Sequence, residues 1–156
     1  MNNRDRIIDE LTRALERDPW YGPAISEVLE GVDATAAAAR PIAGAHSIWE
    51  LVHHVTAWVR AIHTRLKGSV CELAGEADWP PVREPSERAW TAAVDNLRRA
   101  QAELVATLRS LGDADLGATT PNRDYDLEYL LRGLTQHHAY HTGQMAIIKN
   151  AGRKRT

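Results

Sequence analysis

Four long segments of the chain repeat apolar residues every three or four positions, the spacing that places side chains on one face of an α-helix. We expect these helices at about residues 3–16, 47–67, 86–111 and 125–150. No segment alternates apolar and polar residues with a period of two, as a half-buried strand would. The pattern therefore predicts an all-α protein built as a four-helix bundle.

The segments between the helices predict how the helices are connected. Residues 68–85 contain two glycines and three prolines, so this connection has little room for regular structure. Its length favours a crossover between the second and third long helices, with Trp79 as an anchor, over a simple up-and-down order. Ser47 and Glu50 form a capping-box pattern at the start of the second long helix. A short helix is also expected through Ile25, Val28 and Leu29.

Composition limits the class of protein. Of the 156 residues, 44% are hydrophobic and 26% are charged, which is typical of a single folded domain over residues 1–156. Lys and Arg total 19 and Asp and Glu total 21, so the chain has no excess of positive charge and we expect no nucleic-acid partner. The positive charges of the tail at 149–156 are expected to interact favourably with the C-terminal end of the helix dipole. The charged beginning lacks the apolar core region of a signal peptide, and no apolar run of about 18 residues occurs, so we expect no membrane partner. A single cysteine predicts a cytoplasmic protein.

Histidine is the residue type that suggests chemistry. The seven histidines fall into two groups, at 46–63 and 137–141, whereas Cys71 is the only cysteine. One cysteine cannot form an internal disulfide or a thiolate metal site, so a metal must be bound by nitrogen or oxygen ligands. Cys71 itself lies in the connection at 68–85 and is interpreted as an incidental thiol.

The last long helix carries a candidate pair of metal ligands. His137 and His141 are four residues apart and share a face, the geometry in which two imidazoles bind one cation. His138 and His141 are three apart and could share a face as well, so periodicity alone does not choose the second ligand. A further interpretation is that these histidines are partly buried and hydrogen-bond each other or the backbone.

The second long helix could supply a third ligand. His54 borders the apolar stripe between Leu51 and Trp58, and Glu50, one turn earlier, is a candidate partner for its ring N–H. His53 is rotated away from this stripe and is expected to face solvent. Taken together, the two helices supply three neutral nitrogen ligands and leave coordination positions open, as in catalytic rather than structural sites.

Two motifs resemble a known family. Residues 47–55, followed about eighty residues later by residues 137–145, resemble the DinB-like superfamily, which includes the YfiT-like metal-dependent hydrolases. His54 before Val55 matches the first motif of the family. The second motif, H-x-x-x-H-x-G-Q, is matched by His137, His141, Gly143 and Gln144.

The resemblance implies a divalent metal, nickel or zinc, bound by His54, His137 and His141 in a four-helix bundle that forms a homodimer. It also implies a small-molecule substrate and either hydrolysis or transfer of small thiols such as mycothiol or bacillithiol. In a chain with one cysteine, such a thiol is expected to come from outside the protein. The alternative function is a non-catalytic bundle that binds a metal or a small ligand in a stress or damage response.

Two residues near the second motif are candidate catalytic residues. Gln144, three beyond His141, could orient a ligand or a water, or hydrogen-bond between packed helices. Tyr140 could donate a proton or a hydrogen bond, or face solvent on the helix surface. Trp49 and Trp58 are expected to line the site or to fill the core, because the chain has no phenylalanine.

Overall fold

The computed structural model describes residues 1–153, and in these residues it contains six α-helices, two short 3-10 helices and no strand. The last three residues of the basic tail lie outside this range. The four long helices are α1 (Asn3–Leu15), α4 (Ile48–Leu66), α5 (Glu87–Ser110) and α6 (Leu127–Arg153). The short ones are α2 (Ile25–Leu29), α3 (Ala34–Ala38), η1 (Gly75–Ala77) and η2 (Asp113–Gly117). The predicted all-α bundle of four long helices is confirmed.

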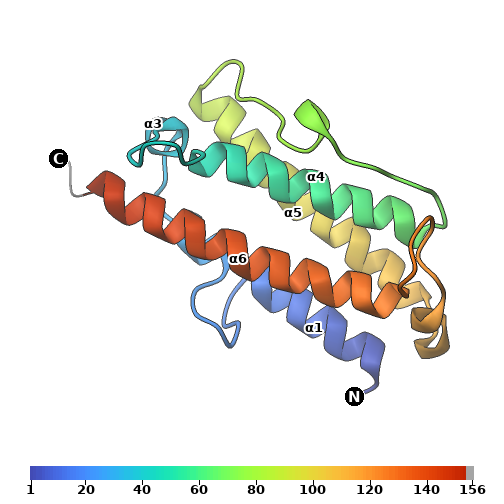
Figure 1. Cartoon of the computed structure of the whole chain (residues 1–156). Coiled ribbons are helices and arrows are strands. Elements are labelled where there is room, and N and C mark those ends of the chain that lie inside the picture. The colour runs from blue at the N-terminus through green and yellow to red at the C-terminus, as the bar shows by residue number, and fades with distance from the viewer. Residues whose placement is uncertain (154–156) are drawn as a thin grey trace.

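The four long helices pack in a ring, in the order α1, α5, α4 and α6. Helices α4 and α5 run in the same direction, and α1 and α6 run in the opposite direction (Figure 1). Side-chain contacts agree with the parallel pair, because Trp49 packs on Trp90 near one end while His63 bonds to Thr107 nearer the other. Parallel neighbours need a connection as long as the bundle, so the predicted crossover between the second and third long helices is confirmed.

Local hydrogen bonds set where helices α4 and α5 begin and how the chain leaves α4. The Ser47 hydroxyl accepts from the Glu50 backbone N–H at 3.2 Å, and the Glu50 carboxylate accepts from the Ser47 N–H at 2.8 Å. This is the predicted capping box. The Ser86 hydroxyl caps α5 by accepting from the Ala89 N–H at 3.2 Å. Gly68, with φ of 87°, turns the chain out of α4 in the left-handed region that glycine favours.

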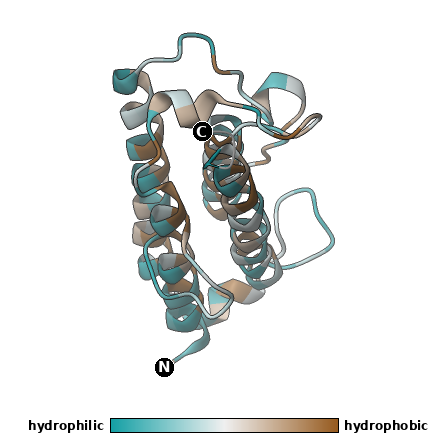
Figure 2. Ribbon diagram, turned by 90° about the vertical axis from the view of Figure 1, so that its left-hand side faces the viewer, coloured by the Kyte–Doolittle hydropathy of each residue, from teal (hydrophilic) through white to brown (hydrophobic). Residues whose placement is uncertain are grey.

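The apolar stripes of the long helices meet in a common core. Figure 2 shows hydrophilic and hydrophobic bands alternating along these helices, as expected for amphipathic helices. Leu11 of α1, Val52 of α4, Leu104 of α5 and Leu131 of α6 are fully buried. Among residues 1–153, no helix combines the length and the apolar character needed to cross a membrane. A core packed this closely holds the polar side chains on facing helices in fixed positions as well.

Candidate metal centre

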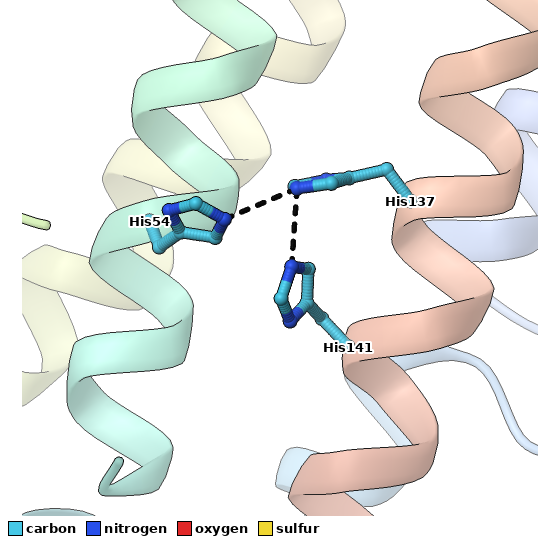
Figure 3. Close-up of side chains that lie close together, drawn as sticks. All are labelled: His54, His137 and His141. Carbon is cyan, nitrogen blue, oxygen red and sulfur yellow. Dashed lines mark hydrogen bonds between the residues drawn. The ribbon is translucent and has the colours of Figure 1, made fainter. Parts of the chain in front are cut away.

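Three histidines from two helices meet at one point between α4 and α6 (Figure 3). The Nε2 atom of His137 is 3.1 Å from the Nε2 of His54 and 3.1 Å from the Nε2 of His141. One ligand atom from each of the three residues lies within 4.8 Å of the other two. Nitrogen atoms bound to one ion at about 2.1 Å stand roughly 3 Å apart. The cluster therefore has the spacing of a metal site with three imidazole ligands.

Hydrogen bonds behind the cluster fix where two of the rings carry their proton. The Nδ1 of His54 is 2.8 Å from the backbone carbonyl oxygen of Asp78 and 3.1 Å from the Asp78 Oδ1. The Nδ1 of His141 is 2.6 Å from the Oε1 of Gln144. Because these oxygens can only accept, each Nδ1 donates its proton to them. Each Nε2 then keeps a lone pair directed at the cluster.

The single N–H of His137 cannot donate to the Nε2 lone pairs of both His54 and His141. Its Nδ1 is buried and has no hydrogen-bond partner in the described part of the chain. A neutral imidazole has one N–H, so the Nε2 of His137 can donate to His54 or to His141 but not to both. A buried acceptor left without a partner is unfavourable. A cation at the centre would satisfy all three nitrogens, so the residues present fit a divalent metal.

Burial keeps the α6 histidines of the cluster uncharged. Burial, together with the nearby His141, His54 and His138, lowers the pKa of His137 to about 3. Burial also lowers the pKa of His141, although its hydrogen bond to Gln144 acts in the opposite direction. Both rings are therefore neutral at pH 7, which is the state in which imidazole binds a metal.

The connection between α4 and α5 covers one side of the cluster. Trp79 stacks on the ring of His54 with 3.9 Å between centroids, and His46 stacks on Trp79 at 3.7 Å. The Asp78 Oδ1 also accepts from the Nε1 of Trp58 at 2.8 Å. Asp78 thus links an aromatic side chain of α4 to a candidate ligand on the same helix. Trp79 packs against the core, so it anchors the connection as expected.

The prediction that Glu50 accepts a hydrogen bond from the ring N–H of His54 was wrong. The Glu50 carboxylate bonds to the backbone N–H of Ser47 and pairs with Arg40. Asp78 provides the acceptors for His54 instead. Sequence reasoning missed Asp78 because its place beside His54 depends on how the connection folds back over α4, and a lone acidic residue before a tryptophan is a weak signal.

The expectation that His53 faces solvent was also wrong. Its ring is half-buried, with Nδ1 donating to the carbonyl oxygen of Pro80 at 3.0 Å and Nε2 accepting from the Nε1 of Trp49 at 3.0 Å. His53 therefore holds the connection between α4 and α5 against α4. Trp49 is buried in the core, one of the two positions expected for it.

The structure separates the two alternatives that periodicity left open on α6. His138 is fully buried, and its Nδ1 donates to the carbonyl oxygen of Leu134 at 2.8 Å. It is His137 that the structure brings together with His141 and His54. Tyr140 is 65% exposed, with its ring edge-on to His141 at 4.9 Å between centroids. Its hydroxyl group therefore lies on the helix surface close to the cluster.

Comparison with known protein families gives a match over most of the chain. Residues 23–145 match the family model described as the DinB superfamily. The matched range covers most of the chain and includes His54, His137, His141 and Gln144. No curated protein and no solved structure gives a match.

Proposed function

Because the chain belongs to the DinB superfamily, we propose that it is a metal-dependent enzyme of the thiol S-transferase or hydrolase type. The observation that carries the proposal is the convergence of three imidazole nitrogens from α4 and α6 on one point. In a bundle core, such a group of unpaired lone pairs is unfavourable unless it binds something. Membership of the family and the chemistry of the donor set support the same conclusion.

We assign His54, His137 and His141 as ligands of a divalent ion, nickel or zinc. Three protein ligands leave at least one coordination position for water or substrate, as catalytic zinc sites do. A divalent ion held by neutral ligands supplies a positive charge that lowers the pKa of a water or thiol beside it. The proposal therefore accounts for a nucleophile that is available near neutral pH.

The other residues around the cluster hold the ligands and limit the access of water. Asp78 and Gln144 keep the Nδ1 protons of His54 and His141 in place, which makes both of them positioning residues. Trp79 covers the ring of His54 on one face. We propose that Tyr140, exposed beside His141, donates a hydrogen bond to the substrate.

A thiol substrate would have to come from outside the protein. Cys71 is neither part of the histidine cluster nor one of the residues that line the cavity beside His137. Its backbone carbonyl accepts two hydrogen bonds from Arg65, which gives the residue a structural role. Any thiol that reacts at the site must therefore be a small molecule that binds from solution.

Metal stoichiometry is the first test of the proposed function. Protein purified without a nickel column is treated with a chelator and then titrated with Ni²⁺ or Zn²⁺ by calorimetry. We expect about one ion per chain, and no binding by His137→Ala or His141→Ala when circular dichroism shows that they fold. His63→Gln removes a histidine of α4 outside the cluster and should bind like the wild type. A wild-type protein that binds neither ion would contradict the proposal.

Turnover is the second test. Metal-loaded and metal-free protein are assayed with low-molecular-weight thiols plus an aryl halide, and separately with aryl esters in water. The first reaction replaces the carbon–halogen bond by a carbon–sulfur bond and releases halide and a proton. The second consumes water, breaks the acyl–oxygen bond and releases a carboxylic acid and a phenol. Turnover that requires the metal and is lost in His137→Ala would support an enzyme. Stoichiometric metal binding without turnover would favour the non-catalytic stress-response bundle.

We also propose that the chain forms a homodimer, on the basis of its resemblance to the family. Sedimentation of the full chain at micromolar concentration should then give twice the chain mass of 17.3 kDa. A mass of 17.3 kDa under these conditions would contradict this part of the proposal.

A further inference from the structure

A cavity of about 280 Å³ lies between α4 and α6, and His137 is one of the residues that line it. Its volume is close to the lower limit of roughly 300 Å³ for small-molecule sites in proteins. Most of its wall is apolar. The apolar and aromatic lining residues are Trp58, Ile62, Tyr125, Tyr129, Leu130 and Leu134. The cavity therefore suits a ligand of modest size with an apolar body.

The two ends of this cavity differ in chemistry. His137 of the cluster stands at one end, beside Trp58 at 5.7 Å between ring centroids. Arg65 and Arg123 line the other end. The side chain of Arg65 turns back along α4, with its Cζ 5.7 Å from the centroid of the Trp58 ring, so this ring neighbours both His137 and Arg65. A small ligand packed along Trp58 therefore contacts His137 at one end and the guanidinium groups at the other.

The arginine end carries an excess of positive charge. The side chain of Arg65 is 3% exposed, and its Nε and Nη2 donate to the neutral carbonyl of Cys71 at 2.9 and 2.6 Å. Arg123 donates to the Glu72 carboxylate at 2.6 Å, and that carboxylate is 3.7 Å from Arg65. One carboxylate thus neutralises the charge of only one of the two guanidinium groups. In a cavity with apolar walls, the remaining charge favours an anionic ligand group such as a carboxylate.

Gly133 of α6 contributes to the space in this cavity. It lines the cavity, and a Cβ atom added to it would meet no atom within 4 Å. A large side chain at this position would extend into the cavity and fill it. Gly143, on the same helix, also has open space around an added Cβ, but it is exposed and does not line the cavity. The two glycines therefore provide a matched pair for substitution.

From these observations we infer that the cavity is the substrate pocket and that it binds a small carboxylate-bearing molecule with an apolar body. The carboxylate lies against Arg123 and Arg65, and the opposite end reaches His137. The inference rests on the proposed function, because it places the reacting end of the substrate at the candidate metal centre. The contacts along the walls and with the arginines form whether or not a metal is bound.

The test compares 4-phenylbutyrate with its neutral amide, which has nearly the same shape. Binding to metal-free and to Zn²⁺-loaded protein is measured by calorimetry, with ligand-observed nuclear magnetic resonance for weak complexes. We expect the carboxylate to bind at least about tenfold more tightly than the amide in both forms of the protein. Arg123→Gln should weaken binding of the carboxylate about tenfold and leave binding of the amide unchanged.

Substitution of the two glycines tests the location. Gly133→Leu should abolish binding of both probes, whereas Gly143→Leu should bind both like the wild type. Both variants are expected to fold, because leucine favours a helix more than glycine does, and circular dichroism checks this. Undiminished binding by folded Gly133→Leu would overturn the assignment of the pocket.

Other outcomes separate this inference from the proposed function. Equal affinity for carboxylate and amide in the wild type would overturn the inference. So would a carboxylate preference that needs Zn²⁺ and survives Arg123→Gln, because the carboxylate would then bind the metal and not the arginine. Carboxylate preference that depends on Arg123, in a protein that binds no metal, would support the pocket and contradict the proposed metal enzyme.

Discussion

The two sides of the bundle bury polar groups in different ways. Between α4 and α6, three imidazoles converge and their protons cannot satisfy every nitrogen. On the side of α1 and α5, Gln101 is a single buried polar side chain among fully buried leucines such as Leu104. Its Nε2 donates to the carbonyl oxygen of Leu11 at 2.9 Å, and its Oε1 has no partner among the described residues. The α1–α5 side thus buries one neutral amide in an apolar core, whereas the α4–α6 side gathers three ring nitrogens at one point, which costs stability unless a cation binds there.

The largest difference expected between the two sides is in how a bound metal changes the free energy of unfolding. With free Zn²⁺ at about 1,000 times its dissociation constant, a site that exists only in the folded chain raises the free energy of unfolding by about 4 kcal/mol. His141→Ala should remove this increment, and Gln101→Leu should retain it. Urea unfolding with and without Zn²⁺ measures both. The same increment in His141→Ala would place the metal elsewhere.

A core substitution on the α1–α5 side should cost stability without affecting the metal. Leu104 is fully buried, so Leu104→Ala is expected to lower the free energy of unfolding by roughly 3 kcal/mol. The loss should be the same with and without Zn²⁺, and the variant should still bind about one ion per chain. A lower stoichiometry in the folded variant would show that the two sides are not independent.

Removing the Asp78 side chain tests how much the connection between α4 and α5 contributes to the affinity for a metal between α4 and α6. Asp78→Ala leaves the backbone carbonyl but removes the Oδ1 that lies near His54 and bonds to Trp58. We expect the affinity for Zn²⁺ to fall about tenfold, as for other residues that orient a metal ligand. Glu76→Ala, at an exposed position of the same connection, is the control for calorimetry. Equal affinities would mean that the carbonyl alone positions the ring.

A smaller effect is expected from pH at the contact between α4 and α5, which joins the two sides. The ring of His63 bonds to the Thr107 hydroxyl at 2.8 Å, and burial, with a contribution from Lys67, lowers the pKa of this histidine. The unfolded chain therefore binds more protons as the pH falls below about 6.5, so the folded state loses stability there and is unaffected by this group at higher pH.

His63→Gln should reduce that loss, by less than about 1 kcal/mol because the ring is partly exposed. The measurement is urea unfolding of metal-free protein from about pH 8 to about pH 5, a range that includes the ordinary pKa of histidine. Parallel stability curves for the variant and the wild type would contradict the assignment.

The smallest effect is expected at an exposed ion pair of α1, far from either buried region. Arg13 and Asp9 form this pair at 2.9 Å with both side chains about half exposed. Arg13→Ala should change the free energy of unfolding by no more than about 0.5 kcal/mol and should leave Zn²⁺ affinity as it is. A larger loss in thermal unfolding would indicate that α1 depends on this pair.

The helices were predictable because their signals are local. The apolar spacing placed all four long helices, and Ser47 with Glu50 marked the start of α4. The ends were less certain, since α6 continues to Arg153 and not to about residue 150. The crossover was predictable too, because a connection as long as residues 68–85 can return the chain along the bundle.

The candidate site was predictable only in part. The spacing of His137 and His141 follows from helix geometry, as does the reach of Gln144 back to His141. The choice of His137 over His138 depends on how α6 is rotated about its axis, which the packing of leucines from other helices decides. The positions of Asp78 and Trp79 depend on the path of the connection, for which local spacing carries no signal.

The sequence by itself determined the helices, the caps and the restriction of any metal site to nitrogen or oxygen ligands. These depend on residue type and on neighbours within about four positions. Only the tertiary structure decided that His54 meets His137, that Asp78 fixes a ring proton, and that a cavity opens toward Arg65 and Arg123. These contacts join residues far apart in the chain, so they form only when the packed core sets the rotation and separation of the helices.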